Sequence, residues 1–231
     1  MLRSIAFIPD GNRRYAKSAG LSLAKAYVLG VKKAWQTLTW LEDYPNIKVG
    51  SFYALSLKNL QRKRHELNLL FRIFEKEFKA IKKSNYFEEH GIKIKFIGRL
   101  DLLSSRIRAH IRDIEEYTAN FSNRLINIAL GYDGRQEIID AAVRVAEDYK
   151  EGRLDISKLN EEKFSDYLYY NFPEPDLIIR TSGEHRLSGF LTYLSTYSEL
   201  YFCQKYWPEF EKTDLEAAIE DYESRERRFG R

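Results

Sequence analysis

Cysteine is almost absent from the chain, and so are long hydrophobic runs. Cys203 is the only cysteine among 231 residues, so no disulfide can form within the chain, and a reducing compartment is its simplest location. No segment approaches the ~20 apolar residues that cross a bilayer, and the amino-terminal apolar run is too short for a signal peptide. The sequence therefore predicts a cytoplasmic protein that contacts a membrane, if at all, only peripherally.

An excess of charge of one sign is also lacking. The chain has 38 basic and 34 acidic residues, and this balance gives no overall reason to expect a nucleic-acid partner. The motifs GxxxxGK[ST], GxGxxG and GxSxG are missing, as is a Cys/His cluster with zinc-ligand spacing. A nucleotide is therefore not the obvious ligand. The four histidines are dispersed and are expected at the surface: His65, His90, His110 and His185.

What the chain does contain is a regular alternation of strand-like and helical segments. This pattern predicts crossover connections and a mostly parallel sheet. The expected strands are Ser4–Ile8, Ile47–Leu55, Ile92–Ile97, Leu125–Leu130, Asp176–Arg180 and Glu199–Cys203. The expected helices are Ala24–Leu41, Arg64–Lys83, Leu102–Ala119, Gly134–Lys150, Glu161–Tyr169 and Thr213 to Arg227. We predict an α/β fold, with a central sheet of about six strands and helices on both faces, in one domain spanning 1–231.

The most informative segment is 175–188, where an apolar strand runs into a cationic loop. Arg180 and Arg186 supply guanidinium forks, and the loop adds hydroxyl groups, among them that of Ser188. Forked N–H donors match the paired oxygens of a phosphate or diphosphate. Ligands in open α/β sheets lie at the carboxyl ends of strands. This loop therefore predicts an anion-binding site.

A second polar loop, PDGNRR, directly follows the first strand. Gly11 and Asn12 suit a tight strand-to-helix turn, and Arg13 and Arg14 add positive charge beside the helix start. Asp10 fits this cationic loop if its carboxylate holds a Mg²⁺ that bridges to diphosphate oxygens. The alternative is an ordinary Asp-Gly turn in which Asp10 caps the helix.

Two further segments carry polar groups of the same kind. Ser56, Asn59 and Arg62 follow the second strand, where Asn59 is a candidate to position a substrate or relay a proton. The alternative is a polar loop that caps the next helix. Glu199 lies among apolar and aromatic residues, where a carboxylate is costly unless a cation or metal pairs with it. Its alternative is an edge-strand carboxylate facing water.

Two amphipathic helices offer an apolar surface beside these loops. Residues 24–41 and 64–83 both place apolar side chains at i, i+3/i+4 and i+7, which usually indicates core packing. Beside diphosphate-binding loops, the same faces also suit a slot for a hydrocarbon tail. Its bulky residues are candidates to limit tail length: Trp35, Phe71, Phe74 and Phe78.

Taken together, these motifs resemble those of a known family. The segments DGNRRYAK, FYALSLKN, GYDGRQEI, PDLIIRTSGEHRLSGFL, YSELYF with WPEF, and RERRFGR occur in this order. They are similar to the motifs of cis-prenyltransferases, the undecaprenyl or dehydrodolichyl diphosphate synthase family. The resemblance implies a parallel α/β sheet with an apolar tunnel between helices and sheet. It also implies a homodimer and the Mg²⁺-dependent condensation of isopentenyl diphosphate with an allylic prenyl diphosphate.

The resemblance also assigns roles to particular residues. Asp10 matches the essential metal-binding aspartate, and Glu199 matches the second acid at the metal. Ser56 and Asn59 match a polar pair that acts in ionisation or proton removal. Gly11, Asn12, Arg13 and Arg14 match the loop that holds the allylic diphosphate, and Arg62 and Glu66 match the next Arg and Glu of the family motifs. Tyr15 and Arg62 are also expected to bind substrate. Residues that match the isopentenyl diphosphate site are Arg180, Arg186 and Ser188. Arg228-Phe229-Gly230 resembles a motif that reaches the partner's active site across the dimer.

The chain also departs from the family pattern at several positions. Leu23 and Tyr27 stand where the family usually has Arg and His, and Lys58 replaces a usual glutamate. Our hypothesis is that Arg13, where many members have glycine, replaces the missing charge. These departures bear on the identity of the allylic substrate.

Three competing interpretations remain at this point. One is a non-catalytic partner subunit of a two-component prenyltransferase, although such partners tend to lose the aspartate loop and the arginines that are present here. Another is a variant that condenses two allylic diphosphates. The third is a phosphotransferase or phosphatase, for which the chain offers no clear nucleophile.

Overall fold

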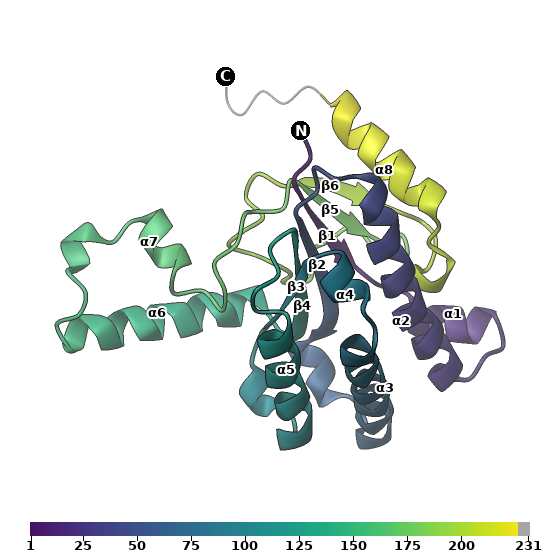
Figure 1. Cartoon of the computed structure of the whole chain (residues 1–231), viewed down its shortest axis with the longest axis horizontal. Coiled ribbons are helices and arrows are strands. Elements are labelled where there is room, and N and C mark those ends of the chain that lie inside the picture. Colours follow the sequence, from purple (N-terminus) through teal and green to yellow (C-terminus); the bar gives the residue numbers. More distant parts are fainter. Residues whose placement is uncertain (226–231) are drawn as a thin grey trace.

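The computed structural model describes residues 1–225 (Figure 1). Its centre is a six-stranded sheet with the strand order β3-β4-β2-β1-β5-β6. All five strand pairings are parallel. The strands are β1 (Ser4–Ile8), β2 (Val49–Ser56), β3 (Ile92–Ile97), β4 (Arg124–Tyr132), β5 (Leu177–Arg180) and β6 (Glu199–Phe202). The predicted mostly parallel α/β fold is confirmed.

Eight α-helices lie within residues 1–225. They are α1 (Asn12–Ser18), α2 (Leu23–Trp40), α3 (Arg64–Lys83), α4 (Tyr86–Glu89), α5 (Ser105–Tyr117), α6 (Gly134–Lys150), α7 (Glu161–Ser165) and α8 (Lys212–Ser224). Short 3-10 helices are η1 (Leu41–Asp43), η2 (Leu57–Gln61), η3 (Leu100–Leu102), η4 (Ile156–Lys158) and η5 (Trp207–Glu209).

The central strand β1 explains why both faces of the sheet are covered. All five of its residues are buried, and successive side chains point to opposite faces. Ile5 and Phe7 join a large apolar cluster with residues of α2, α3, α5 and α8. Ala6 and Ile8 join a second cluster on the other face, with Ala141 of α6 and apolar residues of the segments 164–172 and 187–194.

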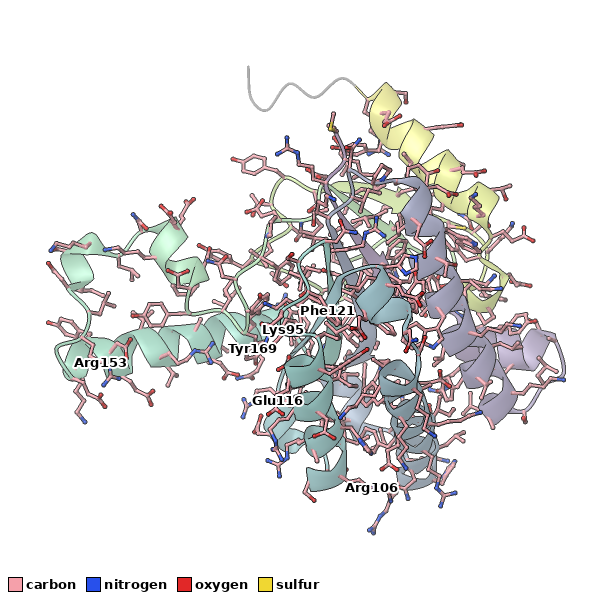
Figure 2. All side chains as sticks on the ribbon, in the orientation of Figure 1. Lys95, Arg106, Glu116, Phe121, Arg153 and Tyr169 are labelled. Atoms are coloured by element: carbon pink, nitrogen blue, oxygen red, sulfur yellow. The ribbon has the colours of Figure 1, made fainter. Side chains whose placement is uncertain are left out.

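Helix α6 only partly covers that second face. In Figure 1 it runs outward from the sheet and, with η4 and α7, forms an arm that projects from the rest of the molecule. Figure 2 shows Arg153 at the far end of this arm and Tyr169 near its base. The exposed side chains of Ile139 and Val143 lie one helical turn apart on α6. Among the described residues, no helix has the length and apolarity required to cross a membrane.

Candidate active site

The order of the strands brings two of the predicted loops together. β1 and β5 are neighbours, and the register pairs Ile8 with Arg180. The chain reaches β2 on one side of β1 and returns to β5 on the other, so the strand order reverses between β1 and β5. Ligands in open parallel sheets bind at such a point, outside the carboxyl ends of the strands. Asp10 and the loop after Arg180 lie there.

A single cavity of ≈ 1170 Å³ collects the loops that follow β1, β2, β4 and β5. The predicted site residues that line it are Asp10, Gly11, Asn12, Arg13, Arg14, Ser56, Asn59, Arg62, Arg180, Arg186 and Ser188. In the described part of the chain, eight Lys and Arg residues line the cavity, against three acids, Asp10, Glu77 and Asp133. The mouth of the cavity, which is the part lined by these loops, is therefore strongly cationic, as an anion-binding site requires.

Asp10 is the carboxylate held among these cations. Arg180 donates from Nη2 to Oδ2 of Asp10 over 2.7 Å, and Nη2 of Arg14 lies 3.3 Å from the same oxygen. The backbone N–H of Gly11 donates to Oδ1. Burial alone would raise the pKa of the Asp10 carboxyl, but the hydrogen bond and charge of Arg180, with the charge of Arg14, lower that pKa below its ordinary value. Asp10 therefore stays ionised.

Thr181 ties the β1 loop to the β5 loop. The backbone N–H of Asp10 donates to Oγ1 of Thr181 (2.9 Å), and this hydroxyl in turn donates to the carbonyl of Asp10 (2.8 Å). Thr181 is buried. The two cationic loops therefore keep a fixed relation before any ligand arrives, which is the preorganisation that electrostatic catalysis needs.

The β5 loop is held in an unusual backbone conformation by arginines. Ser182 and Ser188 have φ of 76° and 53°, a left-handed region that serine rarely adopts. Arg14 donates to Oγ of Ser182 (2.6 Å), and Arg180 donates to Oγ of Ser188 (2.8 Å). Arg180 is only 4% exposed, and within the described residues its buried Nε has no hydrogen-bond partner. Arg186 is exposed and pairs with Glu184.

A third group of charges lies at the start of α3, beside the same cavity. Glu66 is almost fully buried and accepts hydrogen bonds at Oε1 from the Tyr27 hydroxyl (2.6 Å) and from Nη1 of Arg62 (3.0 Å). The same Nη1 of Arg62 also donates to the Tyr27 hydroxyl (2.9 Å). Nε of Arg13 lies 4.0 Å from Oε1 of Glu66. Tyr27, Arg62 and Arg13 line the cavity.

The inner part of the cavity is apolar. Its walls come from α2, α3 and the sheet face between them, and include Val31, Leu70, Phe74, Phe78 and Ile128. The indole N–H of Trp35 donates to Oε2 of Glu77 over 2.8 Å and so bridges α2 to α3. Both helices run away from the carboxyl edge of the sheet, so this bridge lies deeper than the Tyr27–Glu66 contact, by about two turns on α2 and about three on α3. A hydrocarbon tail fits this lining.

Three of the sequence expectations need correction. Tyr15 is not among the cavity-lining residues, whereas Arg13, Arg14 and Lys17 are. Successive helix residues are rotated by about 100°, which turns Tyr15 to the opposite side of α1. Phe71 is also missing from the lining, because Leu70 and Phe74 occupy the cavity face of α3.

Glu199 is the third correction. It pairs with Leu177 at the amino end of β5, whereas Asp10 follows the carboxyl end of β1. Its carboxylate binds Arg225 of the segment after α8, and it does not line the cavity. The expectation that Asp10 and Glu199 converge on one metal within the chain is therefore wrong. The sequence analysis correctly expected a strand to begin at Glu199, but the motif alone did not show that this end of the strand lies away from the sheet edge that carries Asp10.

Several cavity residues were missed by the sequence analysis. Lys17, Lys58, Asp133 and Arg135 all line the cavity. Asp133 and Arg135 directly follow β4, so the rule that ligands lie at strand ends would have found them. Asp133 caps α6 by accepting from the N–H of Arg135 over 3.0 Å.

The donors at the mouth suit Mg²⁺ only in one binding mode. In the described part of the chain, no group of three or more His, Cys, Asp or Glu side chains could hold a metal. Asp10 supplies a single, partly exposed carboxylate beside the cationic loops. Mg²⁺ is usually held by one or two carboxylates together with substrate phosphates. The residues therefore fit a metal that arrives with a diphosphate and do not form an all-protein cage.

These features define a class: an α/β protein whose cavity joins a cationic mouth to an apolar pocket. Residues 8–230 match the family model described as putative undecaprenyl diphosphate synthase. The chain belongs to this family and is a cis-prenyltransferase.

Known relatives agree with this membership. The chain is 45% identical to a tritrans,polycis-undecaprenyl-diphosphate synthase (geranylgeranyl-diphosphate specific) of Thermoplasma acidophilum, over 99% of this chain and 89% of the relative. It is also 45% identical to the enzyme of the same name from Methanopyrus kandleri, over 98% and 84%.

Solved structures share the fold. Lavandulyl diphosphate synthase from Lavandula x intermedia, in complex with dimethylallyl diphosphate, superposes with a TM-score of 0.94 at 30% identity, covering 100% of this chain and 98% of that one. A probable undecaprenyl diphosphate synthase from Campylobacter jejuni has a TM-score of 0.81 at 29% identity, covering 100% and 99%.

Proposed function

We propose that the protein condenses isopentenyl diphosphate with an allylic prenyl diphosphate to give a cis-polyprenyl diphosphate, in a Mg²⁺-dependent reaction. The observation that carries this proposal is the single cavity, cationic at its mouth and apolar inside. A prenyl diphosphate has the same division into a charged head and a hydrocarbon tail. Because the relatives from Thermoplasma acidophilum and Methanopyrus kandleri are named as geranylgeranyl-diphosphate specific, we propose geranylgeranyl diphosphate as the primer.

Two diphosphates need two sets of donors at the mouth. We assign the allylic diphosphate to Gly11, Asn12, Arg13, Arg14 and Arg62. The isopentenyl diphosphate is assigned to Arg180, Arg186 and Ser188. The close packing of the β1 and β5 loops through Asp10 and Thr181 supports this pairing, because two reactants held side by side gain the positional advantage of an intramolecular reaction.

In the proposed reaction, the C1–O bond of the allylic substrate breaks and C1 bonds to C4 of the isopentenyl group. Asp10 would hold Mg²⁺ together with diphosphate oxygens, and the bound ion supplies charge stabilisation to the departing diphosphate. Arg13 and Arg14 stabilise the same developing charge. The proton lost from C2 leaves near Ser56 and Asn59. Asn59 positions the reacting groups, and an oxygen of the departing diphosphate accepts the proton.

The apolar wall is proposed to receive the growing tail and to limit its length. The Trp35–Glu77 hydrogen bond closes the gap between α2 and α3, and Phe74 and Phe78 stack against each other beside it, with ring centroids 6.0 Å apart. A tail that reaches these side chains must displace them to grow further. We propose that this group of residues sets the product length.

We also propose that the chain, folded as one domain, forms a homodimer. The exposed pair Ile139 and Val143 on the projecting arm supports this, because exposed apolar side chains on a projecting element suit burial against a second copy. The motif Arg228-Phe229-Gly230, for which the resemblance implies contact with the partner's site, lies outside the described residues.

A peripheral membrane contact is proposed for the outer face of α3. Arg72, Lys76, Lys79 and Lys83 have the spacing i, i+4, i+7 and i+11, and all are exposed. Among the described residues, none of the four has a carboxylate within ion-pair distance. Basic side chains on one helix face are attracted to anionic lipid headgroups, and the opposite side of α3 lines the tail cavity.

The experiment that tests this function uses the purified chain alone with labelled isopentenyl diphosphate, Mg²⁺ and allylic primers of increasing length. Labelled products longer than the primer, with the highest kcat/KM for geranylgeranyl diphosphate, are expected. An inactive chain would support the non-catalytic partner. Dimethylallyl diphosphate supplied alone tests the condensation of two allylic substrates; the similar lavandulyl diphosphate synthase was solved in complex with this diphosphate. Product from dimethylallyl diphosphate alone would contradict the proposal.

A further inference from the structure

Tyr27 lies between two charged residues at the mouth of the cavity and is only 6% exposed. Its hydroxyl donates to Glu66 over 2.6 Å and accepts from Arg62 over 2.9 Å. The hydroxyl therefore has a partner both as a donor and as an acceptor. Both partners are charged groups, which makes these hydrogen bonds stronger than neutral ones. Tyr27 comes from α2, whereas Arg62 and Glu66 come from the end of η2 and from α3. The phenol thus links two separate elements.

This link determines how the guanidinium of Arg62 is presented. Among the described residues, only Nη1 of its guanidinium donates hydrogen bonds to protein groups, and both acceptors are oxygens of Tyr27 and Glu66. Its Nη2 and Nε groups therefore remain available to a ligand. Glu66 does not itself line the cavity, whereas Tyr27 and Arg62 do. The arrangement anchors one edge of the guanidinium on a buried carboxylate and leaves the other edge for an anion.

From this geometry we infer that Tyr27 is a positioning residue for the allylic diphosphate. Through its contact with Glu66 it fixes the orientation of Arg62, which binds this diphosphate in the proposed function. The inference rests on the proposed function and makes it more specific. It names one side chain that affects the affinity for the allylic substrate and leaves the affinity for isopentenyl diphosphate unchanged. The second affinity is set at Arg180 and Arg186, on the far side of the mouth after β5.

The Tyr27 phenol adds no charge of its own to this subsite near pH 7. The charged groups that face it are Arg13 from α1, Arg62 after η2 and Glu66 from α3. Burial raises the pKa of the Tyr27 phenol well above its ordinary value, and the hydrogen bond to Glu66 raises it further. The phenol therefore stays neutral near pH 7. An imidazole at this position would titrate in that range.

The test measures binding by calorimetry with two probes, geranylgeranyl thiolodiphosphate as an unreactive allylic analogue and isopentenyl diphosphate, each with Mg²⁺. In Tyr27→Phe, the direct Arg62–Glu66 pair remains but the phenol bridge is lost. We expect the Kd for the allylic analogue to rise about three- to ten-fold, with the Kd for isopentenyl diphosphate unchanged. In turnover assays the KM for the allylic substrate rises by the same factor, and kcat changes little.

Tyr86→Phe is the matched control. Tyr86 also donates from a half-buried phenol to a glutamate, Glu42, and burial raises its pKa in the same way. It does not line the cavity. This variant is expected to bind both probes as the wild type does. Thermal unfolding of both variants separates a loss of folded protein from a loss of affinity.

Tyr27→His supplies a second readout that a merely structural role would not change. The ratio of its allylic Kd to that of the wild type is expected to rise between about pH 6 and pH 8 as the imidazole loses its charge. A flat ratio, or equal Kd increases for both probes in Tyr27→Phe, would overturn the inference while leaving the proposed function intact. A wild-type protein that binds neither probe would overturn both.

Discussion

Arg180 and Asp10 form an ion pair, 2.7 Å from Nη2 to Oδ2, that joins the end of β5 to the end of β1. Arg180 is almost fully buried, while Asp10 keeps contact with solvent at the cavity mouth. The pair therefore has two consequences. It stabilises the meeting point of the two loops, and it holds an ionised carboxylate where diphosphates are proposed to bind.

The first prediction concerns the charge of Asp10. Asp10→Asn keeps the shape of the side chain but leaves the buried Arg180 without its anion. We expect the free energy of unfolding to fall by about 1–3 kcal/mol and turnover to fall by at least about 100-fold, as for loss of a key electrostatic group. Urea unfolding and the labelled-substrate assay measure the two effects. Asp148→Asn, which removes an arginine-paired carboxylate on the distant arm, should leave turnover unchanged.

The second prediction concerns pH. Since the folded pKa of Asp10 is lowered, its contribution to stability is present above the unfolded pKa of about 3.9 and is lost as the pH falls through the folded value. The difference in unfolding free energy between wild type and Asp10→Asn should therefore be full at about pH 6 and shrink below about pH 4. A difference that grows on acidification would contradict the sign of this linkage.

The third prediction separates binding from stability at the β5 loop. Arg186→Ala should raise the KM for isopentenyl diphosphate about ten-fold or more, because a charged hydrogen-bond donor to the diphosphate is lost. Its side chain is 59% exposed, so thermal stability should change little. Arg153 on the arm is matched in exposure at 58% and is also paired with acids. Arg153→Ala should leave both KM values unchanged, and an equal effect of the two substitutions would refute the assignment.

The fourth prediction addresses the length of the tail. Trp35→Ala opens the apolar end of the cavity and should shift products to longer chains, whereas Trp35→Phe keeps most of the bulk and should shift them less. Trp40 lies on the same helix but packs near Phe210 and does not line the cavity. Trp40→Ala is therefore the control, and its products should keep the wild-type length. Chromatographic sizing decides, and an unchanged distribution in Trp35→Ala would exclude Trp35 as a limit.

The fifth prediction concerns the turn after β1. Gly11 has φ of 101°, and a Cβ there would lie 2.7 Å from Cδ1 of Tyr206 and 2.9 Å from Cβ of Ser182. Gly11→Ala must therefore distort the loop that carries Asp10 and Arg14. We expect lower turnover and a loss of about 1–3 kcal/mol in unfolding free energy. Gly152→Ala on the arm, which also has positive φ but open space around it, controls for backbone strain alone.

Much of the fold could be predicted because burial on both faces leaves a strong pattern in the sequence. Strands Ser4–Ile8 and Ile92–Ile97 and helices Arg64–Lys83 and Gly134–Lys150 have the predicted bounds. The other strands differ by one or two residues, where strand ends fray into polar loops. The four-residue helix α4 was missed, since one turn carries no periodicity. The predicted helix 161–169 ends at Ser165.

The site residues could be predicted only where their position did not depend on the order and register of the strands. Residues after β1, β2 and β5 were found because polar loops follow apolar runs, and the structure gathers them in one cavity. Glu199 was misplaced because its distance from Asp10 depends on the register of β5 with β6. The Tyr27–Glu66 contact joins residues 39 positions apart in the chain, and no local pattern contains it.

One cavity is proposed to bind both diphosphates at its mouth and the tail between α2 and α3. The decisive measurement is a crystal structure of the protein with geranylgeranyl thiolodiphosphate, isopentenyl diphosphate and Mg²⁺. We expect one diphosphate on Arg13, Arg14 and Arg62, the other on Arg186 and Ser188, and the tail directed toward Trp35. Diphosphates bound elsewhere, or a tail that leaves the cavity, would contradict it.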